Sequence, residues 1–174
     1  MSSNYENPSR ISAFCDGGGS QESGFSLAYV MYTEDGILLR RHGKKIEYLP
    51  IKAPQKIYSS NQAEYMAVIE LLLNIVELRY RAKRSFDTIS LLGTIMDASS
   101  VRVNIFMDSQ LVVRQINKQY KTNDVILKQL LCFIGDTTIL LDNNNVSVRF
   151  YWVPRESNKV ADKLQKEAIN AKDG

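Results

Sequence analysis

Histidine and cysteine are scarce in this chain of 174 residues, which contains one histidine, His42, and two cysteines, Cys15 and Cys132. A single histidine rules out a histidine-rich metal site within one chain, and any serine or cysteine catalytic triad would have to use it. The two cysteines lie far apart and suggest neither a zinc cluster nor a disulfide framework. We expect both thiols to be buried and His42 to be exposed in a basic loop.

Long apolar segments are missing as well. No run approaches the roughly 20 apolar residues that a bilayer requires, and residues 1–10 are polar and lack an apolar signal core. Hydrophobic residues nevertheless make up 44% of the chain, enough to bury a core. The length suits one domain rather than two. We therefore predict a flexible tail over residues 1–9 and a single domain over residues 10–174, forming a monomeric, cytoplasmic protein with no membrane partner.

A strong excess of charge is also lacking, since 22 basic and 19 acidic residues leave a net charge of +3. That value is too small to indicate a polyanionic partner, so the distribution of charge has to be considered. Basic residues gather in residues 40–56 and again in residues 79–84. Each cluster is compatible with nucleic-acid binding, but also with a solvated loop or a frayed helix end.

Strand and helix patterns alternate along the chain. Alternating or continuous apolar residues predict strands, and apolar residues at helical spacing predict helices. The acidic turn at residues 34–36 joins two strands into an antiparallel hairpin. Residues 82–100 show no strong period and are expected to form an extended connection. The predicted strands cover residues 11–16, 25–33, 37–41, 101–107 and 146–153, and the predicted helices cover residues 61–81, 110–117, 123–141 and 157–171. This order predicts an α/β fold in which helices cover both faces of a mixed sheet.

Three acidic residues fall at the ends of these elements. Asp16 lies where the first strand is expected to end at a glycine turn, and Asp108 follows the fourth strand directly. Glu64 takes a position on the buried stripe of the first helix, where an unpaired charge is costly. Each acid alone is more often a helix cap or a surface charge, but three converging carboxylates require divalent cations. Oxygen-only ligands favour Mg²⁺ or Mn²⁺ over zinc.

Four segments resemble, in order, the successive motifs of the type 1 ribonucleases H. They are FCDGG at 14–18, NQAEY at 61–65, FMDSQLV at 106–112 and WVPRESNKVAD at 152–162. The resemblance implies a ribonuclease H-like fold, with three antiparallel strands followed by two parallel ones in a five-stranded mixed sheet. It also implies a catalytic and metal-binding quartet of Asp16, Glu64, Asp108 and Asp162. The periodicity alone would place Asp162 on a solvated face, because Gln165 and Lys166 lie one turn later.

The activity implied by this resemblance is endonucleolytic hydrolysis of the RNA strand of RNA–DNA hybrids. Two Mg²⁺ ions, held about 4 Å apart by the quartet, would carry it and leave a 5′-phosphate and a 3′-hydroxyl. Whether double-stranded RNA is also cut stays open. From a different class, a catalytically silent ribonuclease H-like module for nucleic-acid binding or assembly is the alternative, and the presence of all four acids argues against it.

Substrate contacts are also implied by the resemblance. Ribose 2′-hydroxyls distinguish RNA from DNA in the minor groove of a hybrid, and family members read them with an asparagine, a glutamine and backbone groups. Two hydroxyl residues often lie near a DNA phosphate, although helix capping explains such serines and asparagines equally well. The corresponding residues here are Gly17, Ser59, Ser60, Asn61 and Gln110, with Arg155 as a phosphate or product contact.

Two departures from the bacterial pattern stand out. No histidine lies between Asp108 and Asp162, so the chain resembles the archaeal and plant-like branch that lacks the mobile bacterial histidine. Residues 115–123 are too short and too weakly basic to form the handle that grips the hybrid in some members. Residues 40–56 are our candidate substitute. We expect Trp152 to belong to the core rather than to a stacking platform.

Overall fold

The computed structural model describes residues 9–50, 55–84 and 90–171 of the chain. Among these residues no helix combines the length and the apolarity needed to cross a membrane. All but Ser9 of the tail expected over residues 1–9 lies outside the described residues, and Ser9 already belongs to the first strand. The strands are β1 (Ser9–Ser20), β2 (Gly24–Thr33), β3 (Leu38–Ile46), β4 (Val101–Met107) and β5 (Val146–Trp152). The helices are α1 (Ser60–Lys83), α2 (Leu91–Asp97), α3 (Gln110–Ile116), α4 (Val125–Asp142), a 3₁₀ turn η1 (Arg155–Ser157) and α5 (Lys159–Asn170).

The five strands form one mixed sheet in the order β3-β2-β1-β4-β5. β1 pairs antiparallel with β2, and β2 pairs antiparallel with β3, whereas β4 and β5 run parallel to β1. The predicted five-stranded mixed sheet, with three antiparallel strands followed by two parallel ones, is confirmed. Because β1 and β4 are parallel neighbours, their carboxyl ends meet at one edge of the sheet, where ligands of α/β proteins collect.

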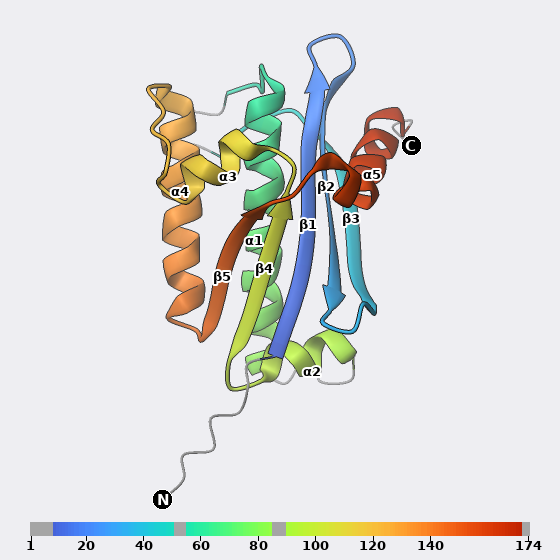
Figure 1. Ribbon diagram of the computed structural model, residues 1–174, viewed down its shortest axis with the longest axis vertical. Coiled ribbons are helices and arrows are strands. Elements are labelled where there is room, and N and C mark those ends of the chain that lie inside the picture. The colour runs from blue at the N-terminus through green and yellow to red at the C-terminus, as the bar shows by residue number, and fades with distance from the viewer. Residues whose placement is uncertain (1–8, 51–54, 85–89, 172–174) are drawn as a thin grey trace, which may run out of the picture.

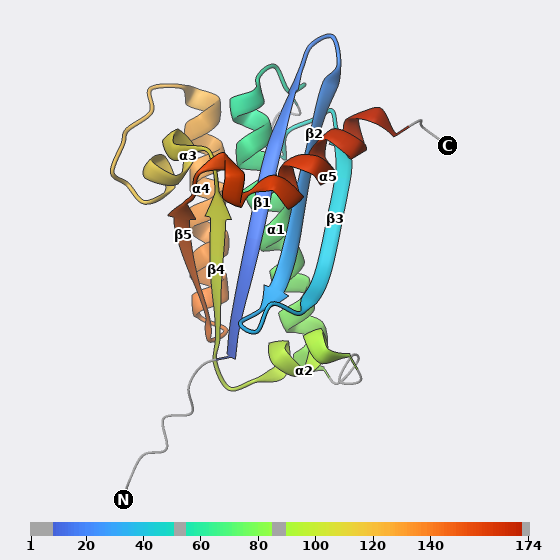
Figure 2. The same cartoon turned by 45° about the vertical axis from the view of Figure 1, so that its right-hand side comes forward.

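The helices are divided unequally between the two faces of the sheet. α1 lies behind the sheet in Figure 1, with α4 packed against α1 and beside β5, and the apolar stripe of α1 is fully buried there, as its spacing predicts. Of the helices that the structure describes, α5 alone lies on the other face, where it crosses β1, β2 and β3 near one end of the sheet in Figure 2. Helices therefore cover both faces, as predicted, but one of those faces only in part.

The glycine turn predicted after residue 16 is wrong. β1 continues through Gly17, Gly18 and Gly19 to Ser20, still paired with β2. The glycines serve close packing instead, because a Cβ atom on Gly17 would lie 2.0 Å from the carbonyl oxygen of Ala63 in α1. At Gly19 the φ angle is +131°, which only glycine adopts readily. The strand thus carries Asp16 into close contact with the start of α1.

Other boundaries also differ from the sequence expectations. The expected extended connection over residues 82–100 contains α2, whose N-cap Ser90 accepts a hydrogen bond from Gly93 N. β3 extends to Ile46, so the first part of the basic segment 40–56 is strand rather than loop. Arg79 is not at a frayed helix end, because it is 2% exposed and donates to the backbone oxygens of Met96, Ala98 and Asn144.

Three single-residue expectations are also overturned. Cys15 is buried as predicted, but Cys132 is exposed on α4. Trp152 is 48% exposed at the end of β5 rather than part of the core. His42 lies in β3, half-buried, with its Nε2 atom 3.7 Å from Glu70 Oε1. The burial of a single side chain depends on tertiary packing, which local sequence pattern does not encode.

Candidate active site

Three carboxylates from three elements meet at the carboxyl edge of the sheet. Phe14 in β1 pairs with Phe106 in β4, so Asp16 and Asp108 each lie two residues further along adjacent parallel strands. Glu64 lies near the start of α1, which Gly17 allows to approach β1. One carboxylate oxygen from each acid lies within 4.8 Å of those of the other two. The sequence-based expectation that these three acids converge therefore agrees with their positions.

Burial and the neighbouring negative charges disfavour ionisation of Asp16 and Glu64. Burial, followed by the negative charges of Asp108 and Asp162, raises the pKa of Asp16 to about 7. Burial, together with Asp16 and Asp108, also raises the pKa of Glu64 well above its usual range. A backbone hydrogen bond from Gly17 and the charge of Arg155 oppose both shifts without cancelling them. A bound cation would remove this penalty, because it favours the ionised carboxylates.

The donor set fits a hard divalent cation. Glu64 Oε2 is buried and has no hydrogen-bond partner among the described residues. The grouped ligand atoms are all carboxylate oxygens, which suit Mg²⁺ or Mn²⁺. Asp16, Glu64 and Asp108 can therefore hold such an ion.

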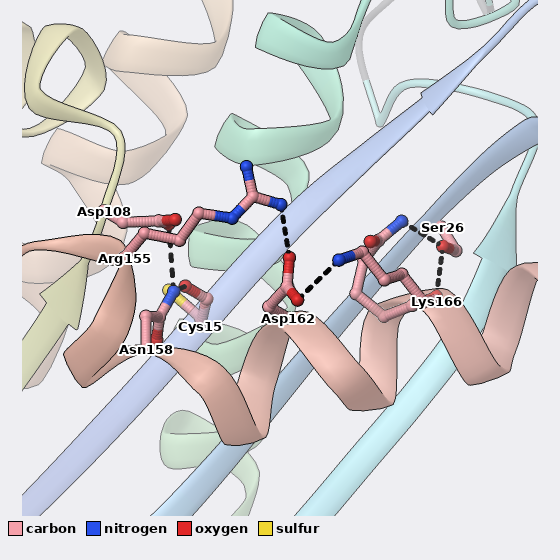
Figure 3. Close-up of polar contacts among 8 residues, drawn as sticks. Cys15, Ser26, Asp108, Arg155, Asn158, Asp162 and Lys166 are labelled. Carbon is pink, nitrogen blue, oxygen red and sulfur yellow. Dashed lines mark hydrogen bonds and ion pairs between the residues drawn. The ribbon is translucent and has the colours of Figure 1, made fainter.

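Asn158 connects this cluster to the last helix. Its side-chain amide donates to Asp108 Oδ1 at 3.0 Å and to the backbone oxygen of Cys15 at 3.1 Å (Figure 3). The residue is 1% exposed and occupies the N-cap position of α5, yet its side chain makes no capping bond. This role of Asn158 was not predicted from the sequence. An asparagine at a helix start, four residues before Asp162, was a signal that could have been used.

Asp162 lies in the first turn of α5 and outside the group formed by the other three acids. Arg155 Nη2 lies 2.7 Å from Asp162 Oδ1, and Lys166 Nζ lies 2.7 Å from Oδ2 (Figure 3). Although burial works in the opposite direction, these two cations lower the pKa of Asp162. The carboxylate is therefore ionised and engaged by two basic side chains beside the cluster.

The surroundings of Asp162 also correct the expected solvated face. Gln165 is 5% exposed, and its Nε2 atom donates to Ser26 Oγ in β2 at 2.7 Å. Ser26 Oγ donates in turn to the backbone oxygen of Gln165 at 2.7 Å. This buried polar pair fixes α5 on the sheet. Of Gln165 and Lys166, which the pattern placed on a solvated face, only Lys166 is exposed.

The expected substrate-contact residues come from several elements: the end of β1, the starts of α1 and α3, and the turn η1. Ser59 caps α1 by accepting from Gln62 N, and Ser60 Oγ donates to the backbone oxygen of Gly19 at 2.7 Å. Both serines thus have structural partners. Asn61 is half-buried at the same helix start, whereas Gln110 and Arg155 are exposed beyond β4 and β5. Gly17 lies between the cluster and α1.

Comparison with known families identifies a match over part of the chain. Residues 91–168 match the family described as "Reverse transcriptase-like". This range includes Asp108, Asn158 and Asp162 but not Asp16 or Glu64. No curated protein sequence matches the chain significantly.

Solved structures extend the likeness to nearly the whole chain. LC11-RNase H1, which was isolated from compost by a metagenomic approach and solved in complex with an RNA/DNA hybrid, is 25% identical with a TM-score of 0.68. The match covers 92% of this chain and 96% of that one. RNase H1 of Halobacterium salinarum is 23% identical with a TM-score of 0.66, covering 92% and 98% of the two chains. The N-terminal RNase H domain of a Mycobacterium tuberculosis protein is 22% identical with the same TM-score, covering 93% and 94%.

These matches confirm the resemblance that the four motifs indicate. The family match and the likeness to RNase H1 structures agree with the sheet order and with the acidic cluster. They do not test the assignment to the archaeal and plant-like branch, which stays a prediction.

Proposed function

We propose that this chain, whose fold is that of the type 1 ribonucleases H, is an endonuclease that hydrolyses the RNA strand of RNA–DNA hybrids. The convergence of Asp16, Glu64 and Asp108 at the carboxyl edge of the sheet is the observation that carries the proposal. The hybrid held by LC11-RNase H1, a protein of the same fold, supports the substrate class.

The proposed metal site consists of the three clustered acids together with Asp162. Two bound Mg²⁺ ions would supply an activated water and would neutralise the leaving 3′-oxygen, giving a 5′-phosphate and a 3′-hydroxyl. Asp16 and Asp108 would contribute most directly to metal binding. Glu64 would hold the ion nearer the leaving 3′-oxygen, and Asp162 would hold the ion that activates water. The unpartnered Glu64 Oε2 and the raised pKa of Asp16 both support cation binding at the cluster.

Residues of the chain itself would prepare the site. Asn158 holds the Asp108 carboxylate in one orientation and ties it to the backbone of β1. Arg155 and Lys166 hold Asp162 ionised beside the cluster. Because Arg155 is exposed, with its guanidinium at this edge, it is also placed to contact a phosphate of substrate or product.

Selection of the RNA strand would fall to polar groups around the acids. Asn61 and Gln110 can present amides to the minor groove, where the ribose 2′-hydroxyls lie. Gly17 brings backbone groups close without a side chain in the way. Ser59 and Ser60 lie at the start of α1, whose positive end favours a phosphate, but their bonds within the protein leave them mainly a positioning role.

A cleavage assay with a labelled hybrid tests the proposal directly. Wild-type protein should cut the RNA strand internally with Mg²⁺, and a chelator should stop the reaction. Asp108→Asn should lose all but a few per cent of the rate, while Asp136→Asn, a charge-matched change on α4, should retain it. Intact hybrid with folded wild-type protein and Mg²⁺ or Mn²⁺ would favour the catalytically silent binding module instead.

A further inference from the structure

The part of the sheet that α5 leaves uncovered has an unusual composition. In Figure 2 no helix lies over the portions of β1, β4 and β5 that precede the acidic edge. The strand register places three positions side by side on this face, Phe14, Phe106 and Tyr151. Tyr32 in β2 lies on the same face, opposite Ser12. We call this surface the aromatic face.

The rings of the aromatic face form a column across three strands. The ring centroids of Phe14 and Phe106 are 4.9 Å apart, with 24° between the ring planes. Those of Phe106 and Tyr151 are 5.4 Å apart at 25°. Tyr32 closes one end by an edge contact with Phe14 at 6.2 Å. The other end is Tyr151 on the edge strand β5, which is 38% exposed.

The charge on this face is of one sign. Apart from Asp16 in the acidic cluster, none of the five strands contains an aspartate or a glutamate. Arg102 and Arg149 lie on the same face as the rings, two to four residues before them along β4 and β5. Neither makes an ion pair with any residue that the structure describes. Arg10 is neutralised by Glu34 at 2.8 Å, so Arg102 and Arg149 carry the uncompensated charge.

A shallow pocket joins the face to the last helix. It has a volume of about 140 Å³ and lies between the sheet and the start of α5. Its lining residues are Phe14, Val30, Tyr32, Ser157, Asn158 and Val160. Asn158 lines this pocket and also donates to Asp108, so the pocket adjoins the candidate active site. Phe14 and Phe106 each precede a clustered acid by two residues, a separation of about 7 Å along a strand.

We propose that the aromatic face binds an unpaired nucleic-acid strand. A ring column that ends in a half-exposed tyrosine offers a stacking surface to a base, and unpaired arginines beside it suit the phosphates. This combination of aromatic stacking and positive charge without acids is complementary to single strands. A duplex would keep its bases stacked inside and could not use the rings. The position next to the acidic edge suits a single-stranded extension of a hybrid bound there.

Direct binding tests the face independently of any cleavage. Short fluorescein-labelled oligothymidylate and oligouridylate are titrated with wild-type protein in the presence of a chelator, and anisotropy is recorded. Both should bind, since stacking tolerates either sugar. Tyr151→Ser and Arg149→Ala should each raise the Kd by about tenfold. The matched controls Tyr80→Ser on α1 and Lys128→Ala on α4 remove a comparable exposed ring or charge elsewhere and should leave the Kd unchanged.

Each contrary result overturns the proposal. Equal affinity of Tyr151→Ser, Arg149→Ala and the wild type would place the strand elsewhere. No binding of either oligonucleotide would remove nucleic acid as the occupant. A wild-type dimer in sedimentation that Tyr151→Ser dissociates, without oligonucleotide binding, would assign the face to a second copy of this chain.

A second measurement connects the face to the proposed function and rests on it. A hybrid with an unpaired RNA extension should show a lower KM than a blunt hybrid, and Tyr151→Ser should abolish the difference with kcat unchanged. Extensions at the 5′ and 3′ ends are compared separately. An equal KM for extended and blunt hybrids in the wild type would show that the aromatic face does not contribute to substrate binding during hydrolysis. If no hybrid is cleaved at all, the proposed function fails, whereas the anisotropy experiment still decides the binding proposal.

Discussion

The side-chain amide of Asn158 donates a hydrogen bond to Asp108 Oδ1 at 3.0 Å, linking the N-terminus of α5 to the end of β4. Because the same amide also binds the backbone oxygen of Cys15, one buried group holds β1, β4 and α5 in a common arrangement. The position of an acid in the cluster therefore depends on a neutral residue that contributes no charge to it.

Replacing Asn158 with Ala should lower kcat for hybrid cleavage by about tenfold or more, because a hydrogen bond to a charged group contributes about 1.5–3 kcal/mol. The free energy of unfolding should also fall, since the backbone oxygen of Cys15 loses its partner. Asn170→Ala, on the exposed end of the same helix, is the matched control and should behave as wild type. Steady-state kinetics at saturating Mg²⁺ separate misorientation from weak metal binding. Unchanged kcat would make Asn158 a purely structural residue.

Stability without metal should fall as the pH rises from about 4 to about 7. The pKa of Asp16 is about 7 in the folded protein and lower when unfolded, so the folded state holds more protons in this window. Deprotonation at the higher pH therefore costs folding free energy, by an amount of order 1–3 kcal/mol. Urea unfolding at a series of pH values, with a chelator present to keep the protein metal-free, measures this change in the free energy of unfolding.

The variant Asp16→Asn should flatten this pH dependence and stabilise the metal-free protein at pH 8, because repulsion within the cluster is relieved. It should also abolish hybrid cleavage. Adding Mg²⁺ at pH 8 should stabilise the wild type more than the variant. An identical pH slope in both proteins would show that Asp16 does not have the raised pKa.

Replacing Asn61 and Gln110 together with Ala should weaken discrimination between the RNA and DNA strands rather than metal binding. Asn61 lies at the start of α1, three residues before Glu64, and Gln110 begins α3, two residues after Asp108. Cleavage of hybrids with single 2′-deoxy substitutions near the cut site reads the effect, with the Mg²⁺ dependence of the rate as control. Unchanged strand preference would reduce the two residues to surface groups.

Changing Arg41, Lys44 and Lys45 to Ala should reduce the salt dependence of hybrid binding. Each phosphate contact contributes about 0.9 to the slope of log affinity against log salt. The three residues alternate between the faces of β3, and Lys44 is already paired with Glu70 at 2.8 Å. We therefore expect a change of less than three units, with kcat unaffected. Titration of an Asp108→Asn background measures it, with Lys128→Ala as control. Equal salt-dependence slopes with and without the triple change would show that other residues contact the phosphates of the hybrid.

Sequence pattern predicted those parts of the fold where local and tertiary preferences agree. β4 spans Val101–Met107, as the apolar residues at every second position predict, and those positions are buried. The apolar stripe of α1 and the hairpin between β2 and β3 follow equally simple rules. Asp108 and Glu64 were predictable because one directly follows β4 and the other lies near the start of α1, whereas Asp16 was found through an expected strand end that β1 does not have.

Residues whose role depends on distant partners were not predictable in this way. Position 17 requires a glycine because the backbone of Ala63 in α1 leaves no room for a Cβ atom. Gln165 is buried because it bonds to Ser26 in β2. Asp162 required a family resemblance, because its own helix shows polar residues around it. Trp152 donates its indole N–H to the backbone oxygen of Asp108, a partner that no local period reveals.

The buried guanidinium of Arg79 has a consequence for how the end of the molecule remote from the acids opens. It binds backbone oxygens at the end of α2, just after α2 and just after α4, while belonging to α1 itself. Withdrawal of any one of these segments would leave a charged donor unpaired in the interior, which is costly. The last turn of α1, α2 and the turn between α4 and β5 should therefore exchange their amide protons with solvent as one cooperative unit rather than fray separately.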